Sequence, residues 1–202
     1  MTAISMGDSE SDEVLRRALA MGAQSGVLIE TDKVLHDPSA RSSLIGNVIK
    51  KEGIAYDMIF TGVQSEDDQF ASLGGIMAAQ FGLPYASMII GIDAFEAHHV
   101  IVRRELEGGL QERVKMAVPC VLSIQSGIND PRYVSIMGIR KASKVERKVF
   151  KAETYTENVK SMIEVVKWTY PEKKGGAMML SGEMETICKK LMEILKEKGV
   201  CK

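Results

Sequence analysis

Residues 102–123 have the sequence V-R-R-E-L-E-G-G-L-Q-E-R-V-K-M-A-V-P-C-V-L-S. Apolar and polar residues alternate on both sides of Gly108-Gly109, which predicts two strands, Val100–Glu105 and Glu112–Val118, joined by a tight turn. An antiparallel hairpin is favoured because a Gly-Gly turn tolerates positive backbone φ angles. A proline then precedes a short apolar run, Cys120–Ile124, which we expect to be a buried strand. This stretch therefore predicts three consecutive strands.

Before this stretch, runs of strand length alternate with apolar stripes of helical spacing. Strands are expected at Thr2–Ser5, Gly26–Ile29, Asp57–Thr61 and Ser87–Ile92. Helices are expected around Val14–Leu19, Leu44–Ile49 and Leu73–Phe81. Strands that alternate with helices build right-handed crossovers and a mostly parallel sheet with helices on both faces. The predicted fold class is therefore α/β, a doubly wound and mostly parallel sheet with an added antiparallel part.

Two loops in this alternation lie where doubly wound proteins bind phosphate groups. Ser5-Met6-Gly7 ends the first expected strand, and the polar loop Gly62–Phe70 follows the third. Each loop precedes a helix, where backbone N–H groups and the helix dipole attract an anion. Gly7 and Gly62 would let the backbone approach a ligand closely, but glycines also form ordinary turns. The residues alone leave both interpretations open.

Composition excludes several classes of function. The formal net charge of -1 and the pI near 6.3 argue against a protein that binds nucleic acid through surplus positive charge. No run of about 18 apolar residues is present, so we expect no membrane span. The N-terminal residues lack the features of a signal peptide and the three cysteines lack C-x-x-C spacing, so we expect a cytoplasmic protein. No catalytic triad, metal-spaced cluster or P-loop lysine is found, so neither catalytic residues nor a metal site are expected.

The C-terminal part has weak periodicity until its last helix. We expect residues 1–145 to form the nucleotide-binding core and residues 146–202 to form an extended arm that ends in a helix. Ser181 can cap that helix, and Gly199 lies past its end. The helix carries one apolar stripe: Met184, Ile187, Cys188, Leu191, Met192 and Leu195. Such a stripe on an arm is expected to be buried against another chain.

Several segments resemble the electron-transfer flavoprotein beta subunit. In residues 102–123, the resemblance rests on the acidic residue before Gly108-Gly109, on Glu112, and on the run from Val114 through Pro119 to Ser123. Four further segments are similar to the family. Residues 4–23 and 61–69 correspond to its nucleotide loops. Residues 128–136 correspond to its partner-recognition loop, and residues 173–200 correspond to its arm and terminal helix.

The resemblance implies a heterodimer with a larger alpha subunit. The alpha subunit would hold most of the FAD, and this chain would bind AMP in the adenine-nucleotide-binding (Rossmann-like) variant of the doubly wound sheet. Such a carrier takes electrons from acyl-CoA dehydrogenases or other flavin dehydrogenases and passes them to a quinone-linked oxidoreductase, without catalytic residues of its own. Two alternatives stay open: a flavin-bifurcating relative that holds a second FAD in this chain, and a nucleotide-binding or structural module without redox function. A prokaryotic, cytoplasmic setting is implied.

The resemblance also assigns residues. Nucleotide-binding positions are Ser5, Met6, Gly7, Gly62, Gln64, Ser65, Asp68, Ala71, Ser72 and Leu73. Partner-recognition positions are Pro131, Arg132, Tyr133, Ile136, Met137 and Glu105, with Ile136 as the anchor.

Two features depart from the family pattern. Ala71-Ser72-Leu73 replaces polar residues that the family often has at the end of the second loop. The family's first strand and helix have no counterpart in this sequence, and either truncation or supply of that edge by a partner would account for it.

Overall fold

The chain folds into two compact units, Met1–Val165 and Val166–Lys202. The computed structural model describes residues 1–145, 147–172 and 175–200. The first unit contains two sheets and four α-helices among these residues, and the second contains one α-helix. The boundary between core and arm lies later than the expected position after residue 145, because residues 147–155 belong to the first unit.

The first sheet contains three parallel strands in the order β1-β2-β8. The strands are β1 (Thr2–Gly7), β2 (Ser25–Glu30) and β8 (Arg147–Lys151), and the helices that follow β1 and β2 are α1 (Ser11–Ala20) and α2 (Pro38–Lys51). The expected alternation of strand and helix is therefore confirmed for the first third of the chain.

The second sheet is mixed, in the order β3-β7-β4-β5-β6. Its strands are β3 (Met58–Gly62), β4 (Tyr85–Glu96), β5 (His99–Glu105), β6 (Gln111–Ala117) and β7 (Cys120–Ile124). β3, β7 and β4 run parallel, whereas β4, β5 and β6 run antiparallel. The predicted α/β class with an added antiparallel part is confirmed. Among the described residues, β1 pairs only with β2 and β3 pairs only with β7, so each has one open edge.

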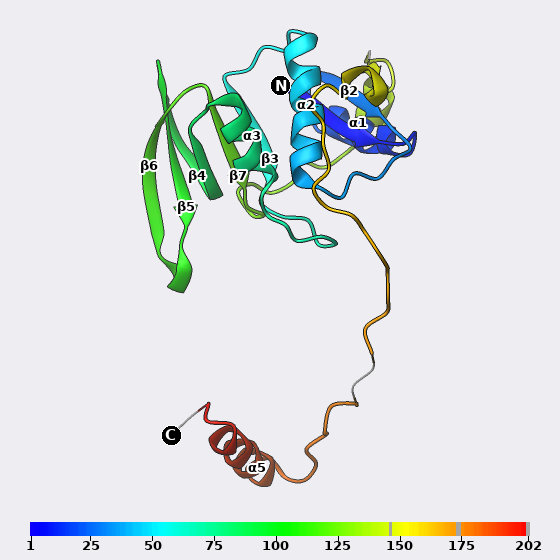
Figure 1. The fold of residues 1–202 in the computed structure, drawn as a ribbon. Helices are drawn as coiled ribbons and strands as arrows, with labels where there is room; N and C mark the ends of the chain where they lie inside the picture. The colour runs from blue at the N-terminus through cyan, green and yellow to red at the C-terminus, as the bar shows by residue number, and fades with distance from the viewer. Residues whose placement is uncertain (146, 173–174, 201–202) are drawn as a thin grey trace. The chain divides into compact units, whose positions relative to one another are not determined.

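Helices lie against these sheets (Figure 1), and apolar side chains pack between them. Leu44 and Val48 of α2 pack against Val27 and Ile29 of β2. The helix α3 (Leu73–Phe81) contacts β3, β4 and β7 and lies beside α2. On α1, buried Leu19 packs near Ala142, the last residue of α4 (Ile136–Ala142). Burying these side chains removes them from water, which is the main favourable contribution to the fold.

Strand β8 corrects the expectation that the arm begins at residue 146. Phe150 packs in the same apolar cluster as β2, and its ring meets Tyr155 edge-on at 5.8 Å between ring centres. Tyr155 belongs to a short helix, η2 (Ala152–Tyr155), and both ends of η2 are buried. The sequence obscured this strand because it is short and mostly charged, a composition that suits the edge of a sheet.

The second unit contains α5 (Met184–Glu197). Ser181 does not cap it: the helix begins after Glu183, and no side chain accepts a capping hydrogen bond. The physical reason is the backbone at Gly182, whose φ of +129° is far from helical, so the helix starts only beyond it. None of the described residues of α5 is buried.

Candidate functional site

The loop between β3 and α3 is organised by one carboxylate. Asp68 accepts a hydrogen bond from the Ser65 hydroxyl at 2.7 Å and one from the Phe70 backbone N–H at 3.2 Å. Its second oxygen pairs with the Arg41 guanidinium at 2.6 Å. The Ser65 hydroxyl, followed by Arg41, holds the pKa of Asp68 below its ordinary value. The Asp68 carboxylate therefore links the Ser65 side chain and the Phe70 backbone of this loop to Arg41 of α2.

The same loop contains strained backbone. Gln69 and Ala71 have φ angles of +52° and +51°, in the left-handed region that residues other than glycine rarely adopt. Each such residue costs on the order of 1–2 kcal/mol, so the surrounding hydrogen bonds must hold it in place. Ala71 is one of the predicted nucleotide-binding positions, so the strain lies within the predicted site.

Helix α3 begins directly after this loop and lies close to the sheet. Ser72 is its N-terminal cap residue, but the Ser72 hydroxyl makes no capping hydrogen bond. A side chain at Gly74 would lie 2.3 Å from the Ser123 hydroxyl oxygen and 2.6 Å from that of Thr61. These two hydroxyls are hydrogen-bonded to each other at 2.8 Å. Only glycine lets α3 approach β3 and β7 so closely. The first backbone N–H groups of α3, like those of any helix, have no partner within the helix and can therefore bind a ligand.

The first predicted loop differs from the second. Ser5, Met6 and Gly7 form the end of β1, and Asp8 follows. The Asp8 carboxylate already accepts hydrogen bonds from the backbone N–H groups of Glu10 and Ser11, at 3.0 and 3.4 Å. The first turn of α1 also carries acidic side chains. Of the two helix termini, that of α3 is therefore the better place for an anion. No hydrogen bond or ion pair joins the two loops in the part of the chain that the structure describes.

The predicted partner-recognition residues lie at the start of α4. Arg132 donates a hydrogen bond to the carbonyl of Met21 at the end of α1, at 3.4 Å. A cation at that end of a helix is favourable because the exposed carbonyls are negative. Beyond Arg132, three of the predicted recognition residues are large apolar side chains exposed to solvent: Tyr133 (92%), Ile136 (73%) and Met137 (64%). Pro131 is exposed as well. The loop is thus fastened at one point and presents apolar groups outward.

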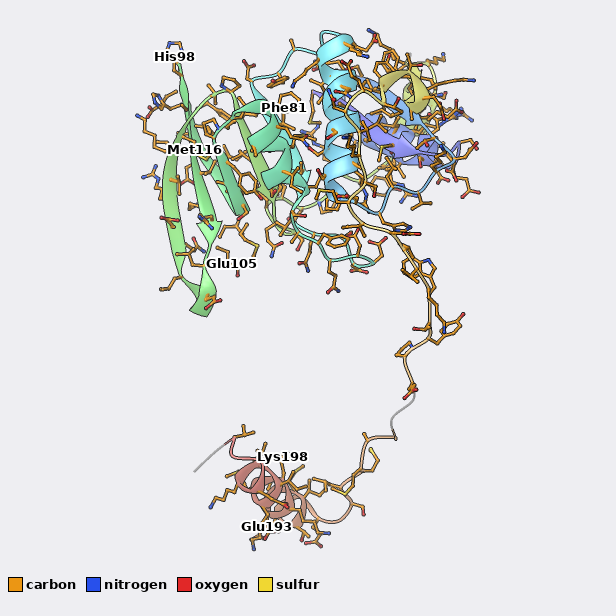
Figure 2. All side chains as sticks on the ribbon, viewed as in Figure 1. Phe81, His98, Glu105, Met116, Glu193 and Lys198 are labelled. Atoms are coloured by element: carbon orange, nitrogen blue, oxygen red, sulfur yellow. The ribbon has the colours of Figure 1, made fainter. Side chains whose placement is uncertain are left out.

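Glu105 lies at a different place on the first unit. Figure 2 shows it near the turn of the β5–β6 hairpin, at the opposite end from His98. Its neighbour Arg104 pairs with Glu112 of β6 at 3.6 Å. Glu105 and Arg104 both border a surface hollow, together with Met88, Leu106, Glu107, Gly108, Gly109 and Gln125. No contact of the described residues connects Glu105 to the 131–137 segment.

Sequence reasoning missed two residues at the start of α2. Arg41 reaches Asp68, and it also donates hydrogen bonds to the carbonyls of Leu35 and His36, the latter at 3.1 Å. Asp37 caps the helix by accepting a bond from the Ser39 N–H at 2.7 Å, and its other oxygen accepts the Met162 N–H. The only available signal was the Asp37-Pro38-Ser39 helix start, which indicates the cap but neither distant partner.

Two further features bear on the kind of site. Residues 1–145, 147–172 and 175–200 contain no group of three or more histidine, cysteine or acidic side chains arranged to hold a metal ion. In the same ranges, no helix combines the length and the apolar character needed to cross a bilayer.

A family model and individual relatives both indicate the same protein family for this chain. Residues 1–155 match the model of the electron transfer flavoprotein domain. The electron transfer flavoprotein subunit beta of Methylophilus methylotrophus is 36% identical over 96% of this chain and 75% of its own length. The subunit of the same name from Dictyostelium discoideum is 31% identical, over 87% of this chain and 68% of its own length. That from Mus musculus is 28% identical, over 98% and 75%.

Proposed function

Because the chain belongs to the family of electron-transfer flavoprotein beta subunits, we propose that it pairs with an alpha subunit and carries electrons between flavin dehydrogenases, such as acyl-CoA dehydrogenases, and a quinone-linked oxidoreductase. In this heterodimer the alpha subunit holds most of the FAD, and this chain supplies AMP binding and partner recognition without catalytic residues of its own. The cysteines without disulfide spacing suit a reducing compartment, such as a prokaryotic cytoplasm.

The observation that carries the proposal is the exposed apolar segment at the start of α4. Tyr133, Ile136 and Met137 are all more than half exposed, although the loop is fastened to α1 through Arg132. Exposed apolar side chains on an otherwise polar and anchored loop mark a contact site for another protein. The position matches the segment that the family uses to recognise dehydrogenases, so Ile136 acts as the anchor that enters a partner pocket.

The nucleotide site lies at the N-terminus of α3. Its phosphate binds to backbone N–H groups around Ser72 and Leu73, because the first turn of α3 carries no acidic side chain and Ser72 does not cap it. Gln64 and Ser65 border the ligand from the loop, and Ser5, Met6 and Gly7 border it from the end of β1. Asp68 also keeps its proposed place at the nucleotide site, and the bonds of its oxygens to Ser65, Phe70 and Arg41 hold it there.

The second unit provides the contact with the alpha subunit. The stripe on α5 leaves Met184 75% exposed and Leu191 and Met192 each 46% exposed. Methionine adapts to irregular apolar surfaces, so a Met-containing stripe suits a groove on a partner. The extended residues before α5 also expose Met178 and Met179. The described residues of the second unit, 166–172 and 175–200, thus belong to an arm that docks on the alpha subunit.

Glu105 contributes to docking through charge. It lies on the hollow near the hairpin turn, apart from the apolar loop at Ile136. A carboxylate at this place attracts a cationic group of the alpha flavin domain. Its contribution depends on ionic strength, because exposed charges are screened by salt.

One experiment tests the proposal as a whole. The chain is co-expressed with its alpha subunit, the complex is purified, and the bound nucleotides are released and quantified alongside the flavin absorbance. One FAD and one AMP per heterodimer are expected. Two flavins without AMP would instead indicate the bifurcating type, and a complex with neither flavin nor AMP would refute electron transfer as the function.

A further inference from the structure

The loop between β3 and α3 depends on a residue outside it. Asp68 is the centre of the loop, and its strongest outside partner is Arg41 of α2, 27 residues earlier in the sequence. The two side chains are 26% and 16% exposed, so solvent screens their ion pair only in part. No other ion pair connects this loop to the rest of the described chain.

Arg41 is itself fixed at several points. Its guanidinium donates to the carbonyls of Leu35 and His36 in addition to Asp68. A planar guanidinium can serve three acceptors in fixed directions, which an ammonium group on a flexible stem cannot. An arginine in the first turn of a helix is unfavourable with respect to the helix dipole. Its presence there is explained by these three bonds, not by helix stability.

The loop needs such support because of its backbone. Gln69 and Ala71 are both in the left-handed region, and Phe70 between them is tied to Asp68 by its N–H group. If Asp68 moved, this bond would be lost and the strained residues would relax toward ordinary backbone angles. The backbone N–H groups that precede α3 would then change direction.

We propose that Arg41 is a positioning residue for nucleotide binding, which holds the 63–72 loop in its binding conformation through Asp68. The inference rests on the proposed nucleotide site and adds to it a residue that touches no part of the ligand. Arg41 acts by fixing the Asp68 carboxylate, and Asp68 in turn fixes Phe70 and the two strained residues.

The test compares four variants of the full-length chain: Arg41→Gln, Arg41→Lys, Asp68→Asn, and the double variant that combines Arg41→Gln with Asp68→Asn. AMP affinity is measured by equilibrium dialysis after bound nucleotide has been removed. We expect Arg41→Gln and Asp68→Asn each to weaken AMP binding about tenfold, equivalent to about 1.4 kcal/mol. The double variant should be no weaker than either single one, because the two residues act as a unit. Arg41→Lys should not restore binding, since it keeps the charge and loses the geometry.

Arg103→Gln is the matched control. Like Arg41, Arg103 forms a close ion pair with an aspartate: it pairs with Asp93 at 2.8 Å. This pair joins strands β5 and β4 and does not involve the 63–72 loop. The Arg103→Gln variant should bind AMP with the affinity of the wild type. Additive effects in the double variant, or full rescue by lysine, would show that Arg41 binds the phosphate by its charge and would overturn the positioning role.

Hydrogen exchange provides a readout that does not require nucleotide. The amides of residues 63–72 should exchange faster in Arg41→Gln and Asp68→Asn than in the wild type, while Arg103→Gln should not change them. Unchanged exchange in Arg41→Gln would refute the inference, as would faster exchange with unchanged AMP affinity. A wild-type chain that takes up no AMP would refute the proposed nucleotide site, and the exchange rates would then still decide whether Arg41 fixes the loop.

Discussion

Asp37 holds two distant parts of the first unit together, and replacing it with asparagine should measurably destabilise the chain. The carboxylate is 3% exposed, and each of its two oxygens accepts one backbone N–H group, from Ser39 and from Met162. Asparagine has one oxygen and one NH₂ group, so it can accept only one of these bonds and places a donor against the other N–H. A hydrogen bond to a charged group contributes roughly 1.5–3 kcal/mol, so we expect a loss of about 2 kcal/mol.

Thermal and urea unfolding of the full-length chain measure this loss. For a chain of this size, about 2 kcal/mol corresponds to a fall in Tm of roughly 4–8 °C. Asp57→Asn is the control, because Asp57 is exposed and its removal should change Tm little. Hydrogen exchange at Met162 should accelerate only in Asp37→Asn, since that bond fastens the segment before the second unit.

The pH dependence follows from the same hydrogen bonds. The Met162 N–H is the largest cause that holds the pKa of Asp37 below its ordinary value of 3.8. A lowered pKa in the folded state stabilises the fold above the unfolded value and loses that contribution as the pH falls through the folded pKa. The difference between wild type and Asp37→Asn should therefore be constant near neutral pH and shrink below about pH 4. Equal stability of the two proteins at pH 7, or unchanged Met162 exchange, would refute the reasoning.

Three further predictions concern recognition, assembly and packing. Ile136→Ala should slow electron acceptance from a dehydrogenase several-fold while the heterodimer stays intact, because a central apolar anchor contributes about 2 kcal/mol; stopped-flow flavin reduction measures this, and unchanged kinetics would exclude the anchor role. Deletion of residues 177–202 should strongly weaken pairing with the alpha subunit in co-purification, and unchanged affinity would contradict the docking role of α5. Gly74→Ala should cost roughly 1–3 kcal/mol in urea unfolding because its methyl group meets the Ser123 hydroxyl; Ser123→Ala should relieve part of this cost, and no loss in Gly74→Ala would show that α3 can move.

Local patterns accounted for most of the elements. The alternation on both sides of Gly108-Gly109 predicted the β5–β6 hairpin within one residue at its ends, because a two-residue period reports the strand itself. The stripes at Leu44–Ile49 and Leu73–Phe81 likewise predicted α2 and α3. The short and charged strand β8 and the seven-residue helix α4 lacked such a period, and neither was predicted.

The candidate site shows a similar division. Position alone indicated the loop after β3, because phosphate groups bind between a strand and the following helix in this class of fold. The resemblance added the residues of the recognition loop, and the structure adds that Tyr133, Ile136 and Met137 are exposed together. Whether a side chain is exposed depends on which elements pack over it, so the pattern of Ile136 and its neighbours could not decide it.

By itself, the sequence determined the class of the fold, the hairpin, the loops before α1 and α3, and the family. These depend on neighbours within a few residues, where side-chain periodicity and turn chemistry act directly. Only the tertiary structure decided that the strands form two separate sheets, that Asp68 meets Arg41, and that Asp37 meets Met162. The partners in the last two pairs lie 27 and 125 residues apart, and such contacts exist only after the chain has closed the loops between them.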